Sequence, residues 1–583
     1  MGRRFDPDRA HLTPGEHILN YAKHMQTEII FKRLANSLLI IGPIVSLAVS
    51  PASSYDPINL IKQLFMCTIS FYGLGLILND SKTVFSKLPK WYWVTSLIFV
   101  ISMLSSTMFS GAPINQQIWG TFGRNTGFLT YFTLFIILTS TAIIQKTDFY
   151  HKLVNGLLLT AVPMTVYCAI QVAKLDPVGW SSKAPFGTLG NINFSSAFFG
   201  ISSICGTVLI LEKRISKVVR LVIGIMVIID LLIVLSTGSI QGFMIFIAGI
   251  GLAGYLYIRS GDTLRKLRLP YAVIAIVGVV VTVMGLSNKG PLAKFLFAPS
   301  IVFRTDYWHA GLQMTLDHPV FGVGLDSYGD WYRSARGLIS TVRTSPDRIA
   351  NTAHNIFLDI SSNGGIPFIS SYLALNFFAF RAGIRILKRD SKFIPYFAAI
   401  FSTWFGYLIF SAISINQVGV GIWGWLFTGA LIGYEIATKD ATSQNPAESK
   451  KAKRKRSQSF PAGAGVLGLV ASLVGFSFAF VPFNADMKYK SALLTRGMDK
   501  IINSTEIIGS TAFHVEMALD LAISNNLQAQ ALELAQRLNR DYPRDFMGWK
   551  AMYVLSDTSD PNRTTAAKKQ HELDPFNPNL PKS

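Results

Sequence analysis

A single histidine marks the segment of this sequence whose residue types are best suited to chemistry. The segment NTAHNIFLDISSNGGIPF (351–368) begins polar, carries His354, and turns apolar before a Gly-Gly pair interrupts it. An imidazole changes its protonation near neutral pH, so it can act as an acid or a base at an aqueous surface. A histidine at the point where a polar segment enters an apolar helix is therefore a candidate reactive group at a membrane boundary.

Two arginines lie in other polar, aromatic and glycine-rich segments. Arg124 lies in GTFGRNTGFLTY (120–131), and Arg304 lies near the start of FRTDYWHAGLQMTLDHPVFGVGLDSYGDWY (303–332). A guanidinium group is planar and permanently charged, and it binds phosphate through two parallel hydrogen bonds. Each arginine is a candidate phosphate ligand, although Arg304 could instead anchor the chain at the lipid interface and Arg124 could simply flank a membrane span.

The elements that position these residues are predicted to be membrane helices. Of the 583 residues, 50% are hydrophobic and 15% are charged, and the mean hydropathy is +0.36. This composition predicts an all-α, polytopic membrane protein. Three cysteines lie inside apolar runs and are expected to be small buried hydrophobes: Cys67, Cys168 and Cys205. The polar N-terminus shows no secretory signal.

About thirteen runs are long and apolar enough to span a bilayer. They are 34–50, 58–78, 91–110, 125–145, 153–173, 194–211, 218–236, 240–258, 270–287, 355–380, 393–414, 418–437 and 462–482. Alternate connections are rich in Lys and Arg, whereas the short connections between them hold few, namely Lys62, Arg124, Lys174 and Lys183. The alternation predicts a multi-pass protein of the cytoplasmic (inner) membrane, with the N-terminus cytoplasmic and the C-terminus extracytoplasmic.

This topology explains most of the net charge of +21. The basic run KKAKRKR (450–456) is interpreted as a stop signal that also touches anionic lipid head groups, rather than as a nucleic-acid site. Three parts are predicted: a cytoplasmic segment (1–33), a membrane domain (34–482) with a long extracytoplasmic loop (288–354), and an extracytoplasmic helical domain (483–583).

The C-terminal part reads as paired amphipathic helices. LNRDYPRDF (538–546) and HELDPFNPN (571–579) look like one helix-ending phrase repeated, and the arrangement resembles tetratricopeptide-type repeats, whose period is about 34 residues. Two interpretations remain open: a docking surface for a protein partner, and a small helical cap without one.

The predicted spans themselves carry little charge. Asp230 and Asp359 are the main exceptions, and the two halves of the chain show no evident repeat. Transporters place ionisable groups within their spans and are often built from internal repeats. The pattern therefore favours a reaction or a binding event at the outer face of the membrane.

Taken together, the loop phrases resemble the O-antigen ligase / O-antigen polymerase superfamily of bacterial membrane glycosyltransferases. The resemblance covers about residues 115–435. It rests on the arginine, tryptophan and HP-x-x-G-x-G of the long loop (His318–Gly324), on the HN that opens the next helix, and on GTLGN-x-N (187–193).

The resemblance implies an enzyme of surface polysaccharide biosynthesis. Its donor would be a glycan linked to a polyprenyl (undecaprenyl) pyrophosphate, and its acceptor a hydroxyl of lipid A core or of another lipid-linked glycan. It implies no need for a metal or a nucleotide sugar. The family's histidine falls on His354, the general base, and its long-loop arginine falls on Arg304, which would bind the pyrophosphate.

Other polar residues in these segments are further candidates for substrate binding. Asn355 and Asp359 lie one turn apart on one helix face, where Asp359 could orient a polar network, cap the helix, or make a buried hydrogen bond. Asn191 and Asn193 could contact sugar or form a turn. The remaining loop histidines, His309 and His318, are expected to be ordinary loop residues, and the GVG beside them a tight turn rather than a nucleotide loop.

Two positions depart from the family pattern. Phe368 stands where a glycine is common, and Gln241, in SIQG, stands where many ligases have a second arginine. Glutamine can hydrogen-bond a phosphate but brings no charge, so Arg124 could compensate.

Polymerase and ligase are not distinguished. Two alternatives from other classes are a transporter or flippase for a lipid-linked glycan, and a non-catalytic scaffold for envelope assembly.

Overall fold

The structure, a computed structural model, describes residues 14–180, 184–261, 264–297, 299–443 and 463–581. In these residues all regular secondary structure is helical, which confirms the predicted all-α class. The predicted spans coincide with thirteen helices: α1 (Pro14–Leu47), α2 (Asn59–Asn79), α4 (Lys90–Phe109), α6 (Phe128–Ile143), α7 (Thr147–Val172), α8 (Ile192–Leu209), α9 (Lys217–Thr237), α10 (Gln241–Ser260), α11 (Arg268–Leu286), α16 (Ile356–Arg389), α17 (Pro395–Ile413), α18 (Val418–Ser443) and α19 (Gly463–Thr495).

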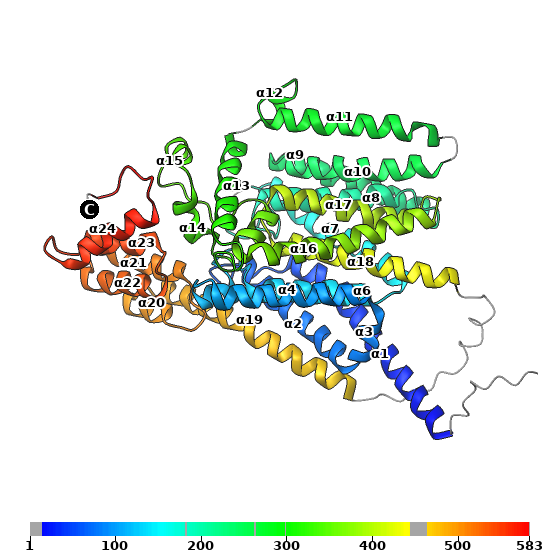
Figure 1. The fold of residues 1–583 in the computed structure, drawn as a ribbon, viewed down its shortest axis with the longest axis horizontal. Helices are drawn as coiled ribbons and strands as arrows, with labels where there is room; N and C mark the ends of the chain where they lie inside the picture. The colour runs from blue at the N-terminus through cyan, green and yellow to red at the C-terminus, as the bar shows by residue number, and fades with distance from the viewer. Residues whose placement is uncertain (1–13, 181–183, 262–263, 298, 444–462, 582–583) are drawn as a thin grey trace, which may run out of the picture.

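Eleven of these helices are long and apolar enough to cross a membrane, which confirms a polytopic bundle. The other two are α6, an apolar helix of 16 residues, and α16, which is 34 residues long and contains a break. The side chains of α11 are almost entirely exposed, and Figure 1 shows this helix at the edge of the bundle. Exposed apolar faces of this kind suit contact with lipid.

The remaining helices connect the spans or follow them. They are α3 (Ser81–Lys87), α5 (Ile114–Trp119), the 3₁₀ helix η1 (Leu264–Leu267), α12 (Ala293–Leu296), α13 (Pro299–Asp317), α14 (Tyr328–Ala335), α15 (Leu338–Thr344), α20 (Met498–Thr505), α21 (Ala512–Ser524), α22 (Gln528–Asp541), α23 (Phe546–Leu555) and α24 (Pro561–Leu573). The long loop is thus mostly helical, and the expectation that His309 is a loop residue is wrong, because it lies on α13.

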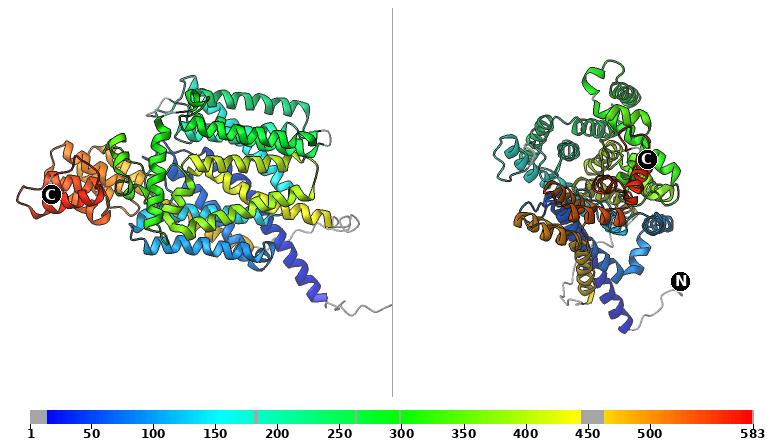
Figure 2. Two further views of the ribbon diagram at one scale, coloured as in Figure 1. Left: turned by 45° about the horizontal axis from the view of Figure 1, so that its top comes forward. Right: turned by 90° about the vertical axis from the view of Figure 1, so that its left-hand side faces the viewer.

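The C-terminal helices α20–α24 gather at one end of the bundle, and α13 crosses that same end (Figures 1 and 2). We call it the C-terminal-domain end. The last span, α19, runs on to Thr495 and so leads directly into these helices. Figure 1 shows the end of α10, the start of α11 and the end of α18 at the opposite end of the bundle. The basic run at 450–456 and the N-terminal residues 1–13 lie outside the described residues.

Small residues allow the spans to pack closely. A Cβ on Gly75 of α2 would meet the Leu467 carbonyl of α19, and one on Gly475 of α19 would meet the Cys67 carbonyl of α2. These positions hold α19, and with it the C-terminal helices, against the start of the chain.

Two buried ionisable side chains within the spans have local partners. Asp230 of α9 accepts hydrogen bonds from the Thr165 hydroxyl at 2.6 Å and the Ser202 hydroxyl at 3.2 Å. Lys62, which the sequence analysis placed in an outside connection, lies buried on α2 and donates to the Val45 and Ser46 carbonyls at the end of α1. Both groups therefore satisfy hydrogen bonds between helices.

The break in α16 is built by the phrase HPVFGVG of the long loop (318–324). Gly365 adopts φ 76°, a left-handed value that glycine tolerates. The helix hydrogen bonds lost at the break are replaced by the loop: Ile366 N donates to the Pro319 carbonyl at 2.7 Å, and Val323 N donates to the Ser362 carbonyl at 2.8 Å. The loop glycines Gly322 and Gly324 have positive φ, as expected for a tight turn.

The two repeated phrases of the C-terminal part both end a helix. Tyr542 follows α22 with φ −133° and ψ 71°, and Asp574 follows α24 with φ −140° and ψ 66°. The like backbone geometry agrees with two related helix pairs, while the tetratricopeptide resemblance itself stays a prediction.

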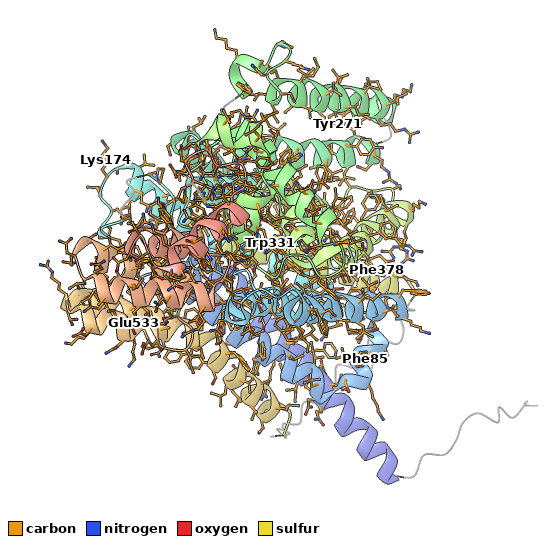
Figure 3. All side chains as sticks on the ribbon, turned by 60° about the vertical axis from the view of Figure 1, so that its left-hand side comes forward. Phe85, Lys174, Tyr271, Trp331, Phe378 and Glu533 are labelled. Carbon is orange, nitrogen blue, oxygen red and sulfur yellow. The ribbon has the colours of Figure 1, made fainter. Side chains whose placement is uncertain are left out.

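These C-terminal helices dock on the long loop and the membrane domain. Arg336, which is fully buried, and Arg333 both pair with Asp574, at 2.8 and 2.9 Å. The rings of Phe122 and Phe513 stack with centroids 4.0 Å apart. The Arg544 guanidinium lies 3.4 Å from the centre of the Trp331 ring, and Figure 3 shows Trp331 beside the C-terminal helices.

Candidate functional site

Arg124 is held by the short loop between α5 and α6. The Asp326 carboxylate organises this loop, because it accepts hydrogen bonds from the backbone N–H groups of Thr121 (2.7 Å) and Thr126 (3.1 Å) and from the Thr126 hydroxyl (2.8 Å). Arg124 Nε lies 3.3 Å from Asp326 Oδ1, and both side chains are buried. Asp326 therefore holds both the α5–α6 loop and Arg124. It belongs to the long loop, about 200 residues later in the chain.

The same guanidinium reaches the segment that carries the histidine. Arg124 Nη1 donates to the Asn351 carbonyl, and Nη2 lies 3.8 Å from Asp359 Oδ2. Asp359 in turn accepts hydrogen bonds from the Thr352 hydroxyl and from the Ala353 N–H, each at 2.8 Å. Arg124 and Asp359 thus hold residues 351–353 from both sides, directly before His354.

His354 has a constrained backbone and a half-buried ring. Its φ is 52°, which is uncommon for a residue with a side chain, and its N–H donates to the Thr352 hydroxyl at 2.9 Å. The ring nitrogen Nδ1 lies 3.4 Å from the Thr352 carbonyl oxygen, and the Tyr307 ring packs at a centroid distance of 5.3 Å. These contacts orient the imidazole.

Electrostatics keep this imidazole neutral. Burial lowers the pKa of His354 to about 4; the Thr352 carbonyl opposes the shift, and the positive charges of Arg304 and Arg124 add to it. A histidine with an ordinary pKa near 6.5 would be partly protonated at neutral pH. His354 is therefore in its proton-accepting form throughout the physiological range.

Arg304 lies in the first two turns of α13, three residues before Tyr307. Burial lowers the pKa of its guanidinium, which nonetheless remains charged at neutral pH. Within the described ranges it has no carboxylate partner at ion-pair distance, unlike Arg124. A half-buried cation without a fixed counter-charge is suited to bind an anionic ligand.

The structure thus brings Arg124, Arg304, His354 and Asp359 together. Asn355, by contrast, has a structural role. The Asn355 side chain caps α16 by accepting hydrogen bonds from Phe357 N (3.0 Å) and Leu358 N (3.2 Å). Its oxygen is engaged in starting the helix that positions Asp359.

Asn191, Asn193 and Gln241 lie in a second group, where α8 and α10 begin. Asn191 caps α8 by accepting from Asn193 N at 2.8 Å, and Asn193 Oδ1 accepts from the Ser239 hydroxyl at 2.7 Å. Gln241 is buried, and its Oε1 has no hydrogen-bond partner among the described residues. Within the part of the chain that the structure describes, no hydrogen bond or ion pair joins Asn191, Asn193 or Gln241 to Arg124 or His354.

Sequence reasoning missed Asp326 and Tyr307. Asp326 follows the recognised GVG turn, and its φ of 57° shows why a short acidic side chain suits this position. Tyr307 follows Arg304 by one helical turn, a signal that required α13 to be recognised as a helix. Neither residue stands out by composition alone.

Part of the chain matches a known protein family. Residues 225–373 match the family described as O-antigen ligase. The matched segment runs from α9 through the long loop into α16, so it contains Gln241, Arg304, His354, Asn355 and Asp359, while Arg124, Asn191 and Asn193 lie before it. No curated protein matches the chain. The part of the membrane region that spans residues 225–373 is therefore similar to the O-antigen ligase family.

Proposed function

We propose that this protein transfers or polymerises a polyprenyl-pyrophosphate-linked glycan onto an acceptor hydroxyl at the extracytoplasmic face of the cytoplasmic membrane. The observation that carries the proposal is that Arg124 holds the segment directly before His354, while Arg304 lies one helical turn from Tyr307, whose ring packs on the same imidazole. Both guanidinium groups act on the His354 ring. A pyrophosphate leaving group and a proton-accepting base are the two requirements of such a transfer, and this arrangement can meet both.

In the proposed reaction the acceptor oxygen forms a bond to the anomeric carbon of the donor sugar. The bond between that carbon and the pyrophosphate oxygen breaks, and the polyprenyl pyrophosphate leaves with the electron pair. His354 takes the acceptor's proton. When Nδ1 carries the ring hydrogen and faces the Thr352 carbonyl, Nε2 is free to accept it.

The low pKa of His354 fits this role once the donor is bound. A base with a pKa of about 4 is weak, so the free enzyme holds the imidazole neutral but poorly reactive. The negative charge of a bound pyrophosphate offsets the two arginines and favours a protonated imidazole. Donor binding therefore raises the basicity of His354 at the moment when a base is needed.

The site lies at the C-terminal-domain end of the bundle, on segments that connect membrane spans. The charge alternation in the sequence predicts that this end is extracytoplasmic. A carrier lipid could then keep its polyprenyl tail between the helices and the lipid while its sugars face water. Such a position agrees with transfer after the glycan has crossed the membrane.

Complementation of a strain lacking this gene tests the proposal. We expect His354→Ala and Arg304→Ala to insert normally, as judged by blotting of membranes, and to leave the glycan on its lipid carrier. Short unpolymerised units would identify a polymerase, and full-length stranded chains a ligase. Wild-type glycan from both variants would overturn the catalytic role and favour a scaffold, and glycan retained on the cytoplasmic side would indicate a flippase.

A further inference from the structure

A cavity of about 300 Å³ lies between the membrane domain, α14 and the C-terminal helices. One wall comes from the segment 115–122 and the other from residues 509–516 and 542–547. Its volume is at the lower end of the range of about 300–1,000 Å³ that is common for small-molecule sites. The reaction proposed above makes no use of this cavity.

The lining of the cavity combines aromatic rings with carboxyl groups. The aromatic residues are Trp119, Phe122, Phe513, Tyr542 and Phe546, and the acidic residues that face them are Asp330, Glu516 and Asp545. Aromatic faces pack against the C–H face of a sugar ring, and carboxyl oxygens accept hydrogen bonds from its hydroxyls. This mixture is suited to a saccharide rather than to a purely apolar ligand.

The charges along the cavity favour a neutral sugar. The arginines of its lining are engaged elsewhere: Arg333 pairs with Asp574, and Arg544 lies on the Trp331 ring and donates to the Ser334 hydroxyl at 2.8 Å. Asp330 accepts a hydrogen bond from Gln116 Nε2 at 2.7 Å, which leaves further acceptor capacity. An anionic sugar would lie close to three buried carboxyl groups while the arginines of the lining are already engaged, which disfavours its binding.

Two of the carboxyl groups act as a pair. Burial, and after it the neighbouring Asp545 carboxyl, raise the pKa of Glu516 to about 9. Like charges this close disfavour full ionisation, so the pair holds a proton at neutral pH. The pair can then both donate a hydrogen bond to a sugar oxygen and accept one from a sugar hydroxyl.

The cavity adjoins the candidate site through shared residues. Asp326 and Asn351 line the cavity, and both hold Arg124, through its Nε and Nη1 atoms respectively. The cavity and the segment that carries His354 are therefore separated only by residues that contact Arg124. Because the C-terminal helices form the far wall, the cavity depends on their docking.

We propose that this cavity binds a neutral sugar unit of the glycan, several atoms away from the reacting carbon, and so makes the C-terminal domain part of the substrate-binding surface. The inference rests on the proposed function, because that function supplies the glycan. The unit belongs either to the donor or to the acceptor chain, since both carry sugars at this face of the membrane.

Binding of released glycan to the full-length protein in lipid nanodiscs tests the inference. The probe is the cell's own glycan, freed from its carrier by mild acid and purified from the deletion strain, with affinity measured by calorimetry. Met547→Trp and Asn115→Trp fill the cavity from its two walls at exposed positions. Lys550→Trp places the same side chain on α23 at an exposed position outside the lining.

We expect both cavity variants to bind at least tenfold more weakly than the wild type, and Lys550→Trp to bind equally well. Glu516→Gln, which keeps the shape of the side chain, is expected to weaken binding by a smaller factor. Equal affinity in all variants, or no saturable binding to the wild type, would overturn the inference. Thermal unfolding of each variant separates lost binding from lost folding.

Two further measurements distinguish a donor sugar from an acceptor sugar, and binding from transfer. A raised KM for the lipid-linked donor in the cavity variants would place the donor's sugar there, and a raised KM for the acceptor would place the acceptor's. His354→Ala is expected to keep its glycan affinity while losing transfer. If the wild type transfers glycan but the cavity variants bind normally, this inference fails while the proposed function stands.

Discussion

Arg124 Nε lies 3.3 Å from the Asp326 carboxylate, and the same arginine donates to the Asn351 carbonyl just before His354. One buried ion pair thus couples the loop before α6, the long loop and the start of α16. The pair gives the candidate site its shape, and it also makes the site sensitive to changes at a residue that touches no substrate in the proposed reaction.

Asp326→Asn should therefore abolish transfer. The substitution removes the closer of the two carboxylates beside Arg124 and leaves only Asp359, at 3.8 Å; breaking a buried pair costs up to about 3–5 kcal/mol. We expect a lower midpoint of thermal unfolding together with loss of glycan transfer in the complementation assay. Asp317→Asn changes an exposed aspartate of α13 and serves as the control. Normal transfer by Asp326→Asn would show that the ion pair is dispensable.

The pH dependence of transfer should report the unusual state of His354. Its pKa in the free protein is about 4, below the ordinary value, so the neutral base persists as pH falls and is lost only near pH 4. We expect kcat/KM, which reports the free enzyme, to stay level down to about pH 5. Because bound pyrophosphate raises the pKa, kcat should fall at a higher pH. A fall of kcat/KM centred near 6.5 would contradict the described environment.

Arg304→Lys and Arg304→Ala should differ in a graded way. Hydrogen bonds to charged groups contribute about 1.5–3 kcal/mol, so loss of the guanidinium should reduce kcat/KM for the donor by about 10- to 150-fold. Lysine keeps the charge but not the planar fork, so an intermediate loss is expected. Lys294→Ala removes an exposed charge from the same loop and should have no effect. Equal rates for all three variants would exclude Arg304 from donor binding.

Gly365→Ala should destabilise the protein through the break in α16. A Cβ at this position would lie 2.5 Å from the Val320 carbonyl oxygen, and the left-handed backbone costs about 1–2 kcal/mol for a residue with a side chain. The matched control is Gly278→Ala on α11, where a Cβ would meet nothing within 4 Å. We expect a lower unfolding midpoint only for Gly365→Ala, with reduced transfer because the break positions Asp359 and His354. An unchanged midpoint would show that the break tolerates a side chain.

The membrane helices could be predicted because their signal is local. A run of about 20 apolar residues is sufficient to indicate a span, whatever it packs against. Long-range partners do not alter that signal, so each predicted span coincides with a helix. The break in α16 was visible as a Gly-Gly pair, but the segment that stabilises it, residues 318–324, lies 41 to 47 residues before Gly365 and could not be matched to it from the sequence.

The candidate site could be predicted only in part. The resemblance pointed to His354 and Arg304, and the structure brings both beside Arg124. The Arg124–Asp326 pair joins residues about 200 positions apart, and neither local spacing nor composition encodes such a contact. Asn191, Asn193 and Gln241 were named with His354 through the resemblance, whereas the hydrogen bond from Ser239 to Asn193 joins α8 to the turn between α9 and α10.

The ion pair between Arg336 and Asp574 joins residues 238 positions apart, and this separation has a consequence for the order of synthesis. The long loop leaves the ribosome well before α24. During translation Arg336 therefore lacks its ion-pair partner, Asp574. The wall of the cavity next to Arg124 is completed only when the C-terminal helices have been made and have folded. In a nascent chain the long loop therefore lacks its contacts with the C-terminal helices, and these contacts form only at the end of synthesis.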